Sequence, residues 1–175
     1  MRRAIFPGTF DPIHNGHMNI AKRAARLFDE LIVSVYDRPL KNLLFTPEER
    51  LELAEKTFPD QDNIKVTLFS GLTVDYCKEV DADFIVRGLR VFSDFELEFR
   101  MALANHRLAP EIEVVALITH EDQSFISGSS VKEIASLGGD VSSMVPEHVA
   151  IALYERFERD GAENMAESLN VSLRD

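Results

Sequence analysis

Short apolar segments rich in β-formers alternate with segments of helical spacing along most of the 175-residue chain. The strand-like segments are residues 4–6, 31–36, 64–69, 84–86 and 113–118. Because a predicted helix separates each pair of successive strands, the strands must run parallel, with helices covering both faces of the sheet. The pattern predicts one α/β domain with a Rossmann-like, five-stranded parallel sheet.

The helix-like segments show apolar residues at helical spacing or a helix-start signal. They are residues 17–28, a helix that opens at 46–49, and residues 72–80, 93–108, 129–137 and 146–159. Thr46, Pro47 and Glu49 supply a cap, a proline at the first helical position and a capping-box glutamate. We expect one domain over residues 1–159 and a polar tail over 160–175 that is mobile or weakly helical.

The loop after the first strand, residues 7–17, combines a glycine turn with two histidines ahead of a helix. Unpaired N–H groups at a helix start attract anions, and histidines there can donate to charge that grows on a reacting phosphate. We interpret His14 and His17 as facing phosphate, with Thr9 offering its hydroxyl and N–H. Two alternatives stay open: a metal site assisted by Asp11, which lacks further ligands of convincing spacing, and a hydrogen-bonded core role for either histidine.

Two further segments carry groups that bind anions. Arg87 and Arg90 flank a glycine where the fourth strand ends, and a guanidinium binds phosphate through paired hydrogen bonds. A solvated surface turn is the alternative for these arginines. Residues 124–133 place serines and a glycine at a helix start, which predicts a second anion site, although a Ser130–Glu133 capping box explains part of the pattern.

The formal net charge of −11 argues against general binding to nucleic acid or to anionic membranes, which both need a basic surface. An anionic substrate must then meet local positive charge that overcomes the field of the whole protein. The single cysteine, Cys77, excludes an internal disulfide, and no apolar stretch approaches membrane-spanning length. We expect a cytoplasmic protein without nucleic-acid or membrane partners.

Five sequence blocks follow one another along the chain. They are Pro-Gly-Thr-Phe-Asp-Pro at 7–12 with Gly-His at 16–17, Phe-Thr-x-Glu-Glu-Arg at 45–50, Arg-Gly-Leu-Arg at 87–90, Asp-Phe-Glu-x-Glu at 94–98, and Ile-Ser-x-Ser-x-Val-Lys-Glu at 126–133. With these blocks the chain closely resembles the bacterial phosphopantetheine adenylyltransferase family of the nucleotidyltransferase superfamily, over about residues 3–159. Arg-Gly-Leu-Arg and Val-Lys-Glu separate that family from its nicotinate-nucleotide and glycerol-phosphate relatives.

The resemblance implies a reaction between ATP and 4′-phosphopantetheine that gives dephospho-coenzyme A and pyrophosphate. It implies Mg²⁺ as the cofactor, for which we assign no protein ligand. It also implies a homohexamer built from two trimers, and it suggests feedback by coenzyme A.

Residue by residue, His17 matches the histidine that stabilises the transition state in the family. The positions that match ATP contacts are Thr9, Phe10, His17, Gly88, Leu89, Arg90, Glu98, Gln123, Ser124, Phe125, Ile126, Ser127, Gly128 and Ser129. The positions that match phosphopantetheine contacts are Thr9, Lys41, Thr73 and Arg87. Without the resemblance, Glu98 would be interpreted as a solvated charge, and Lys41 equally well as a solvated charge or as a ligand.

The chain departs from the family pattern at three positions. Gln123 stands where an aromatic residue is frequent, Gly128 replaces a common serine, and His14 occupies a place often held by threonine. These departures leave the expected reaction class unchanged and concern individual contacts.

Two other functions stay open. The first is a sibling enzyme, such as a nicotinate-nucleotide adenylyltransferase or a cytidylyltransferase. His14 favours it, whereas Lys41, Arg87 and the Val-Lys-Glu sequence at 131–133 oppose it. The second is a non-enzymatic nucleotide sensor, which has no need for transition-state donors such as Thr9, His17 and Arg90.

Overall fold

The structure, a computed structural model, describes residues 1–38 and 43–172, except for the side chains of residues 162–172. Its centre is a five-stranded sheet in the order β3-β2-β1-β4-β5, in which all neighbouring strands are parallel. The strands are β1 (Arg3–Gly8), β2 (Glu30–Tyr36), β3 (Ile64–Phe69), β4 (Phe84–Leu89) and β5 (Glu113–Ile118). The predicted five-stranded parallel sheet is therefore confirmed.

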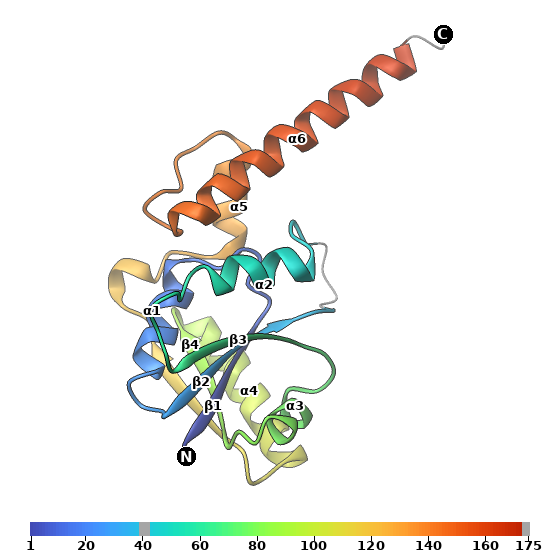
Figure 1. The fold of residues 1–175 in the computed structure, drawn as a ribbon. Coiled ribbons are helices and arrows are strands. Elements are labelled where there is room, and N and C mark those ends of the chain that lie inside the picture. Colours follow the sequence, from blue (N-terminus) through green and yellow to red (C-terminus); the bar gives the residue numbers. More distant parts are fainter. Residues whose placement is uncertain (39–42, 173–175) are drawn as a thin grey trace.

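Helices cover both faces of this sheet (Figure 1). They are α1 (Asn15–Ala24), α2 (Pro47–Glu55), α3 (Thr73–Glu79), α4 (Phe92–Leu108), α5 (Gly128–Ser136) and α6 (Glu147–Ser172), with a short 3₁₀ helix η1 (Glu121–Gln123). Apolar side chains of α1, α2, α5 and α6 pack together on one face, and those of α3 pack on the other. No helix in the described part of the chain is both long and apolar enough to cross a membrane.

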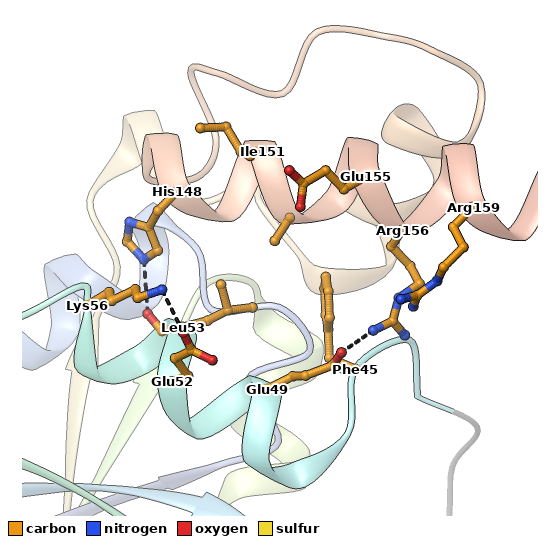
Figure 2. A pocket seen from close by; sticks show the side chains of 11 residues that line it. Phe45, Glu49, Glu52, Leu53, Lys56, His148, Ile151, Glu155, Arg156 and Arg159 are labelled. Atoms are coloured by element: carbon orange, nitrogen blue, oxygen red, sulfur yellow. Dashed lines mark hydrogen bonds and ion pairs between the residues drawn. The ribbon is translucent and has the colours of Figure 1, made fainter.

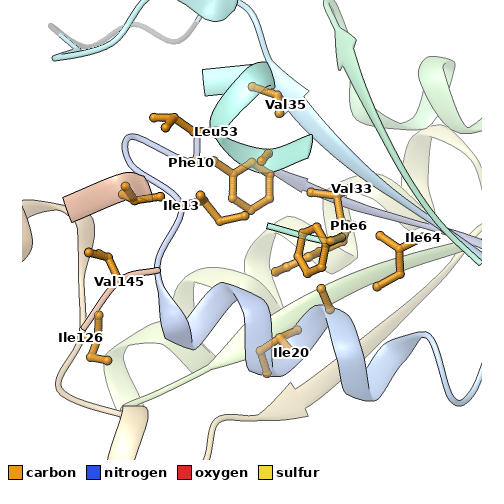
Figure 3. Close-up of a cluster of buried hydrophobic side chains, with 14 of the residues drawn as sticks. Phe6, Phe10, Ile13, Ile20, Val33, Val35, Leu53, Ile64, Ile126 and Val145 are labelled. Atoms are coloured by element: carbon orange, nitrogen blue, oxygen red, sulfur yellow. The ribbon is translucent and has the colours of Figure 1, made fainter. Parts of the chain in front are cut away.

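Alternation along the strands builds the two halves of the core. Ala4 and Phe6 of β1 belong to one buried cluster, and Ile5 between them belongs to the other. The same holds in β2, where Val33 and Ile32 face opposite sides. Because successive side chains of a strand point to opposite faces, a run that is apolar throughout is buried on both. Figure 3 shows the larger cluster, where Phe6 and Val33 lie among side chains of the α1–α2 side.

Several predicted boundaries move in the structure. The first helix was expected at 17–28 but begins at Asn15 and ends at Ala24. The fourth strand was expected to end at residue 86, but β4 continues to Leu89, so the first arginine of the Arg-Gly-Leu-Arg block lies within the strand. The last helix was expected to end at residue 159 but continues to Ser172, leading away from the sheet (Figure 1). The mobility of residues 160–175 stays a prediction.

The strand order creates a switch point beside β1. The chain passes from β1 to β2 and β3 on one side, and it later places β4 and β5 on the other side. In open parallel sheets, ligands bind beyond the carboxyl ends of the strands at such a point. A ligand site is therefore expected at the loops after β1 and β4.

Candidate active site

A cleft of about 720 Å³ opens where β1 and β4 end. Many of the residues that line it were predicted from the sequence to bind a ligand. These are Thr9, Phe10, His17, Arg87, Gly88, Arg90, Glu98, Ser127, Gly128 and Ser129. The fold thus brings three distant segments of the chain, residues 9–17, 87–98 and 127–129, to one cavity.

His14 and His17 close the start of α1 by binding each other. The Nδ1 atom of His14 accepts from the His17 N–H, and Nδ1 of His17 accepts from the His14 N–H, each at 3.3 Å. The two rings stack with their centroids 3.6 Å apart. Because each Nδ1 accepts a hydrogen bond, a neutral ring must carry its proton on Nε2. Each histidine therefore has an Nε2–H donor at the cleft that both of them line.

The glycine between the histidines makes room for this arrangement. A Cβ atom at Gly16 would lie 3.1 Å from both Cε1 and Nδ1 of His14. That is tighter than nearly all real Cβ contacts, so a side chain at this position would displace the His14 ring. Glycine at this position therefore lets the two rings stack without a shift of the His14 ring.

Both histidines are neutral at pH 7. Burial, aided by the charge of Arg90, lowers the pKa of His14 to about 3. Burial, followed by the effects of His14, Arg90 and Arg87, holds the pKa of His17 well below its ordinary value of 6.5. Neutral rings can donate hydrogen bonds without carrying a charge on the free protein.

We expect stability to fall with acidification because of this pair. Between pH 6.5 and about 3 the unfolded chain protonates His14 while the folded protein does not, so each proton favours unfolding. The free energy of unfolding is unaffected by these histidines above pH 6.5. Below that pH, each histidine that stays neutral in the folded protein lowers it by about 1.4 kcal/mol for each pH unit. His14→Asn keeps a cap acceptor without a titrating group, so the decline seen in urea unfolding between pH 6.5 and 5 should become less steep and should reflect His17 without His14. An equal decline in both proteins would contradict the buried neutral state.

Each cationic side chain that lines the described part of the cleft is held by a carboxylate. The pairs are Arg87–Glu98, Arg90–Asp94 and Lys132–Asp11, with N···O distances of 2.6, 3.0 and 2.6 Å. The cleft therefore contains the positive side chains that an anionic substrate would need in so acidic a protein. The paired carboxylates, however, neutralise their charge. Additional attraction for an anion must come from N–H donors of the backbone and of the histidines.

Arg87 is the most constrained of these cations. Its Nε and Nη2 atoms donate to both carboxylate oxygens of Glu98, at 2.7 and 2.6 Å, and Nη1 donates to the Pro7 carbonyl at 2.7 Å. A small cavity of about 90 Å³ adjoins it and is lined by Thr73 as well as by Pro7, Arg87 and Glu98. The two predicted phosphopantetheine contacts Thr73 and Arg87 therefore lie together.

The start of α5 forms another wall of the cleft. Ser127 is its N-cap, and the Ser127 hydroxyl accepts from the Ser130 N–H at 3.1 Å. The predicted Ser130–Glu133 capping box is wrong, because Ser130 lies inside the first turn of the helix instead of capping it. Nη1 of Arg90 donates to the Ile126 carbonyl at 3.1 Å, which joins the end of β4 to this helix start.

Some predicted ligand residues lie outside the lining of the cleft. Leu89 is the last residue of β4, and Gln123 ends the short helix η1. The Ser124 hydroxyl donates a hydrogen bond to the Glu121 carbonyl. The Phe125 side chain is 61% exposed, and Ile126 is buried. Their contacts with a nucleotide stay predictions. Lys41 lies outside the described residues.

The contacts of Asp11 differ from those expected if it assisted a metal site at the two histidines. Its Oδ2 accepts from Lys132 at 2.6 Å and from the Leu44 N–H at 3.0 Å, and its Oδ1 accepts from the Phe45 N–H at 2.9 Å. Among the described residues there is no group of three or more His, Cys, Asp or Glu side chains able to hold a metal ion. Asp11 instead ties α5 and the segment before α2 to the loop after β1.

Sequence reasoning missed Asp11 in this role, as well as Lys132 and Arg50. All three lie inside the sequence blocks that carry the family resemblance, which was the available signal. Arg50 is completely buried and donates to the Thr9 carbonyl at 2.6 Å, although an arginine on an amphipathic helix is expected to face solvent.

A second cavity, of about 380 Å³, lies between α2 and α6 (Figure 2). Arg156 of α6 forms an ion pair with Glu49, donates to the Leu44 carbonyl, and lies 5.1 Å from the centre of the Phe45 ring. These contacts hold the segment that Asp11 binds from the other side. We interpret this region as packing of α6 against the body of the protein.

Residues 5–134 match the family model described as cytidylyltransferase-like. A phosphopantetheine adenylyltransferase of Carboxydothermus hydrogenoformans is 50% identical over 161 residues, which cover 92% of this chain and 99% of the relative. One of Thermomicrobium roseum is 52% identical over 158 residues, covering 89% and 95%. Among solved structures, a putative nicotinate-nucleotide adenylyltransferase from Vibrio parahaemolyticus has a TM-score of 0.66 at 19% identity, covers 87% of this chain and 99% of its own, and shares the fold.

Proposed function

Because the chain belongs to the phosphopantetheine adenylyltransferases, within the cytidylyltransferase-like nucleotidyltransferases, we propose that its cleft joins ATP to 4′-phosphopantetheine. The products are dephospho-coenzyme A and pyrophosphate, in coenzyme A biosynthesis. The observation that carries the proposal is the convergence of the His14–His17 pair, Arg87, Arg90 and the start of α5 on one cleft. Such a set of donors suits transfer between phosphates and includes no nucleophile–base pair.

The reaction requires positioning more than covalent help. A phosphate oxygen of phosphopantetheine, ionised at neutral pH, attacks the α-phosphorus of ATP and forms the new P–O bond. The bond from that phosphorus to the oxygen bridging to the β-phosphate breaks, and pyrophosphate leaves with the electron pair. The protein aligns the two phosphates and stabilises charge on the equatorial and leaving oxygens.

We assign the two ends of the cleft to the two substrates. Arg87 and Thr73, which share the small adjoining cavity, would receive the acceptor. The start of α5 with Ser127–Ser129, and Arg90 beside it, would receive ATP. His17 lies on the cleft wall at the start of α1, where its Nε2–H would donate to the oxygens of the transferring phosphoryl group.

Mg²⁺ is proposed to enter as part of the ATP substrate. Magnesium prefers phosphate and water oxygens to a cage of protein ligands, so we assign it no ligand from the protein. When bound it would reduce the negative charge of ATP, which matters because the cleft cations are paired. The carboxylates of Asp94 and Glu98 already bind arginines and are not assigned to it.

The assay that tests the function measures pyrophosphate release with purified protein, Mg²⁺ and one acceptor at a time. We expect turnover with ATP and 4′-phosphopantetheine, and at least about 10²-fold less with nicotinate mononucleotide, because a site built for one acceptor leaves polar groups unpaired with another. CTP in place of ATP tests the cytidylyltransferase alternative. Faster release with nicotinate mononucleotide or CTP would refute the proposal, and binding of ATP without release with any acceptor would indicate a sensor.

We also propose the homohexamer. None of the α4 residues is buried in the single chain, and its Phe92, Phe95, Phe99 and Leu103 are 85, 50, 53 and 56% exposed. A contiguous apolar surface of this kind marks an interaction site, and a second copy of the chain is the simplest partner. Sedimentation should give about six times the chain mass of 19.8 kDa. A monomer at micromolar concentration would contradict it.

We also propose feedback by coenzyme A and a cytoplasmic location. Coenzyme A contains the phosphopantetheine group, so it should compete with 4′-phosphopantetheine, and inhibition that is independent of the acceptor concentration would exclude a shared pocket. A cytoplasmic location is supported by the cysteine usage of the chain, whose single cysteine, Cys77, is a free thiol.

A further inference from the structure

Arg50 of α2 is among the largest side chains that are completely buried in the protein. Its Nη1 atom donates to the Thr9 carbonyl at 2.6 Å and to the Tyr36 carbonyl at 2.7 Å, and Nη2 lies 3.4 Å from the Asp37 carbonyl. One guanidinium therefore joins the loop after β1 to the end of β2. Burying a charge is costly, so a buried cation whose partners are backbone carbonyls suggests a role beyond general stability.

The bond to Thr9 fixes the direction of a peptide that lines the cleft. A trans peptide is planar, and its carbonyl and N–H point in opposite directions. With the Thr9 oxygen held by Arg50 on one side, the Phe10 N–H must point to the other side. Phe10 also has a φ of 50°, a left-handed backbone conformation that is unusual for a bulky residue and persists only where its surroundings enforce it.

The Phe10 side chain has no freedom to contact a ligand. It is 2% exposed, and its ring packs edge-on against the His17 ring with centroids 4.9 Å apart. A Cβ atom at Gly8 would lie 2.9 Å from this ring, so the ring fills the space beneath that glycine. Among the described residues, the Phe10 N–H has no hydrogen-bond acceptor. The group that Phe10 can offer to a ligand in the cleft is its N–H.

Charge strengthens this donor. A guanidinium bonded to the Thr9 carbonyl polarises the peptide and makes the opposite N–H more positive. Burial lowers the pKa of Arg50, while Asp11, Asp37 and Glu48 oppose that shift, and an arginine stays protonated in such a setting.

We propose that Arg50 is a positioning residue for adenylyl transfer: it holds the Thr9–Phe10 peptide so that the Phe10 N–H is presented to the transferring phosphate beside His17. The proposal rests on the function proposed above. Arg50 itself does not touch substrate, since it is buried behind the loop.

The test compares Arg50→Met, which removes the donors, with Arg50→Lys, whose shorter side chain keeps the charge. Leu53→Ala is the matched control, because Leu53 is a buried residue on the same helix that belongs to the apolar core and does not line the cleft (Figure 3). We expect kcat to fall roughly 10²-fold in Arg50→Met and about 10-fold in Arg50→Lys, as for loss of one oxyanion donor, with KM for ATP changed less than threefold. Leu53→Ala should lower the melting temperature without this loss of kcat.

A crystal structure of the variant supplies a readout that a stability role would not change. We expect the Thr9 carbonyl to turn away from its position in the present structure. An unturned peptide overturns the proposal, as does a kcat within threefold of Leu53→Ala. If Arg50→Met does not fold, kcat and the orientation of the Thr9–Phe10 peptide are measured in Arg50→Lys instead. If the wild-type protein does not adenylate 4′-phosphopantetheine, the proposed function fails, and the orientation of the peptide still decides the role of Arg50.

Discussion

His17→Ala is expected to lower kcat by about 10²–10³-fold, the usual loss for one oxyanion-type donor, with little change in the affinity for ATP. The neutral His17 ring carries its proton on Nε2, since Nδ1 accepts from the His14 N–H. A donor that meets charge developed only in the transition state acts on kcat and leaves ground-state binding nearly unchanged. Steady-state kinetics with saturating 4′-phosphopantetheine and calorimetry with ATP measure the two quantities separately.

A control is needed because His17 also supports the start of α1. His17→Gln keeps an acceptor for the His14 N–H at the third helical position, as in an ordinary capping box. We expect it to melt close to the wild-type temperature and still lose most of its turnover. Near-normal turnover of His17→Ala with both substrates saturating would refute the catalytic role of His17.

Glu98→Ala is expected to raise the KM for 4′-phosphopantetheine by roughly 10–100-fold, as much as Arg87→Ala, with a smaller effect on ATP. Both oxygens of Glu98 are engaged by Arg87, so the carboxylate acts through the arginine that we assign to the acceptor. Stability should fall by about 2–3 kcal/mol, below the loss typical of a fully buried pair, because the Arg87 side chain is 33% exposed.

The same helix offers a matched control for this change. Glu96 pairs with Arg100 on the surface, with side chains 62 and 72% exposed. Glu96→Ala should leave both KM values unchanged and cost less than about 0.5 kcal/mol. The double variant Arg87→Ala with Glu98→Ala should be no worse than either single variant. A rise in the KM for ATP alone would instead assign Glu98 to the nucleotide, as the family resemblance implies.

Much of the fold follows from local patterns. Residues 64–69 and 113–118 were predicted as strands and are β3 and β5 with the same bounds. The capping box of Thr46 and Glu49 is present as predicted. Such features depend on residues a few positions apart in the chain, so local sequence patterns are enough to predict them.

Boundaries that depend on distant partners were predicted less well. Residues 87–89 extend β4 because they pair with residues 116–118 of β5. A glycine between polar and apolar residues gives no local signal that predicts such pairing. The cap of α5 is Ser127 instead of Ser130, in a stretch where several serines satisfy the same local rule.

The sequence by itself determined the parallel α/β sheet and the placing of two histidines in the loop after the first strand, since His14 and His17 meet across one helical turn. Only the tertiary structure decided which partners the charged side chains of the site bind. Lys132 pairs with Asp11 across 121 positions, and Arg50 binds the Thr9 carbonyl across 41. Propensity and periodicity act over a few residues, whereas an ion pair or a buried donor depends on which strand ends the completed sheet places side by side.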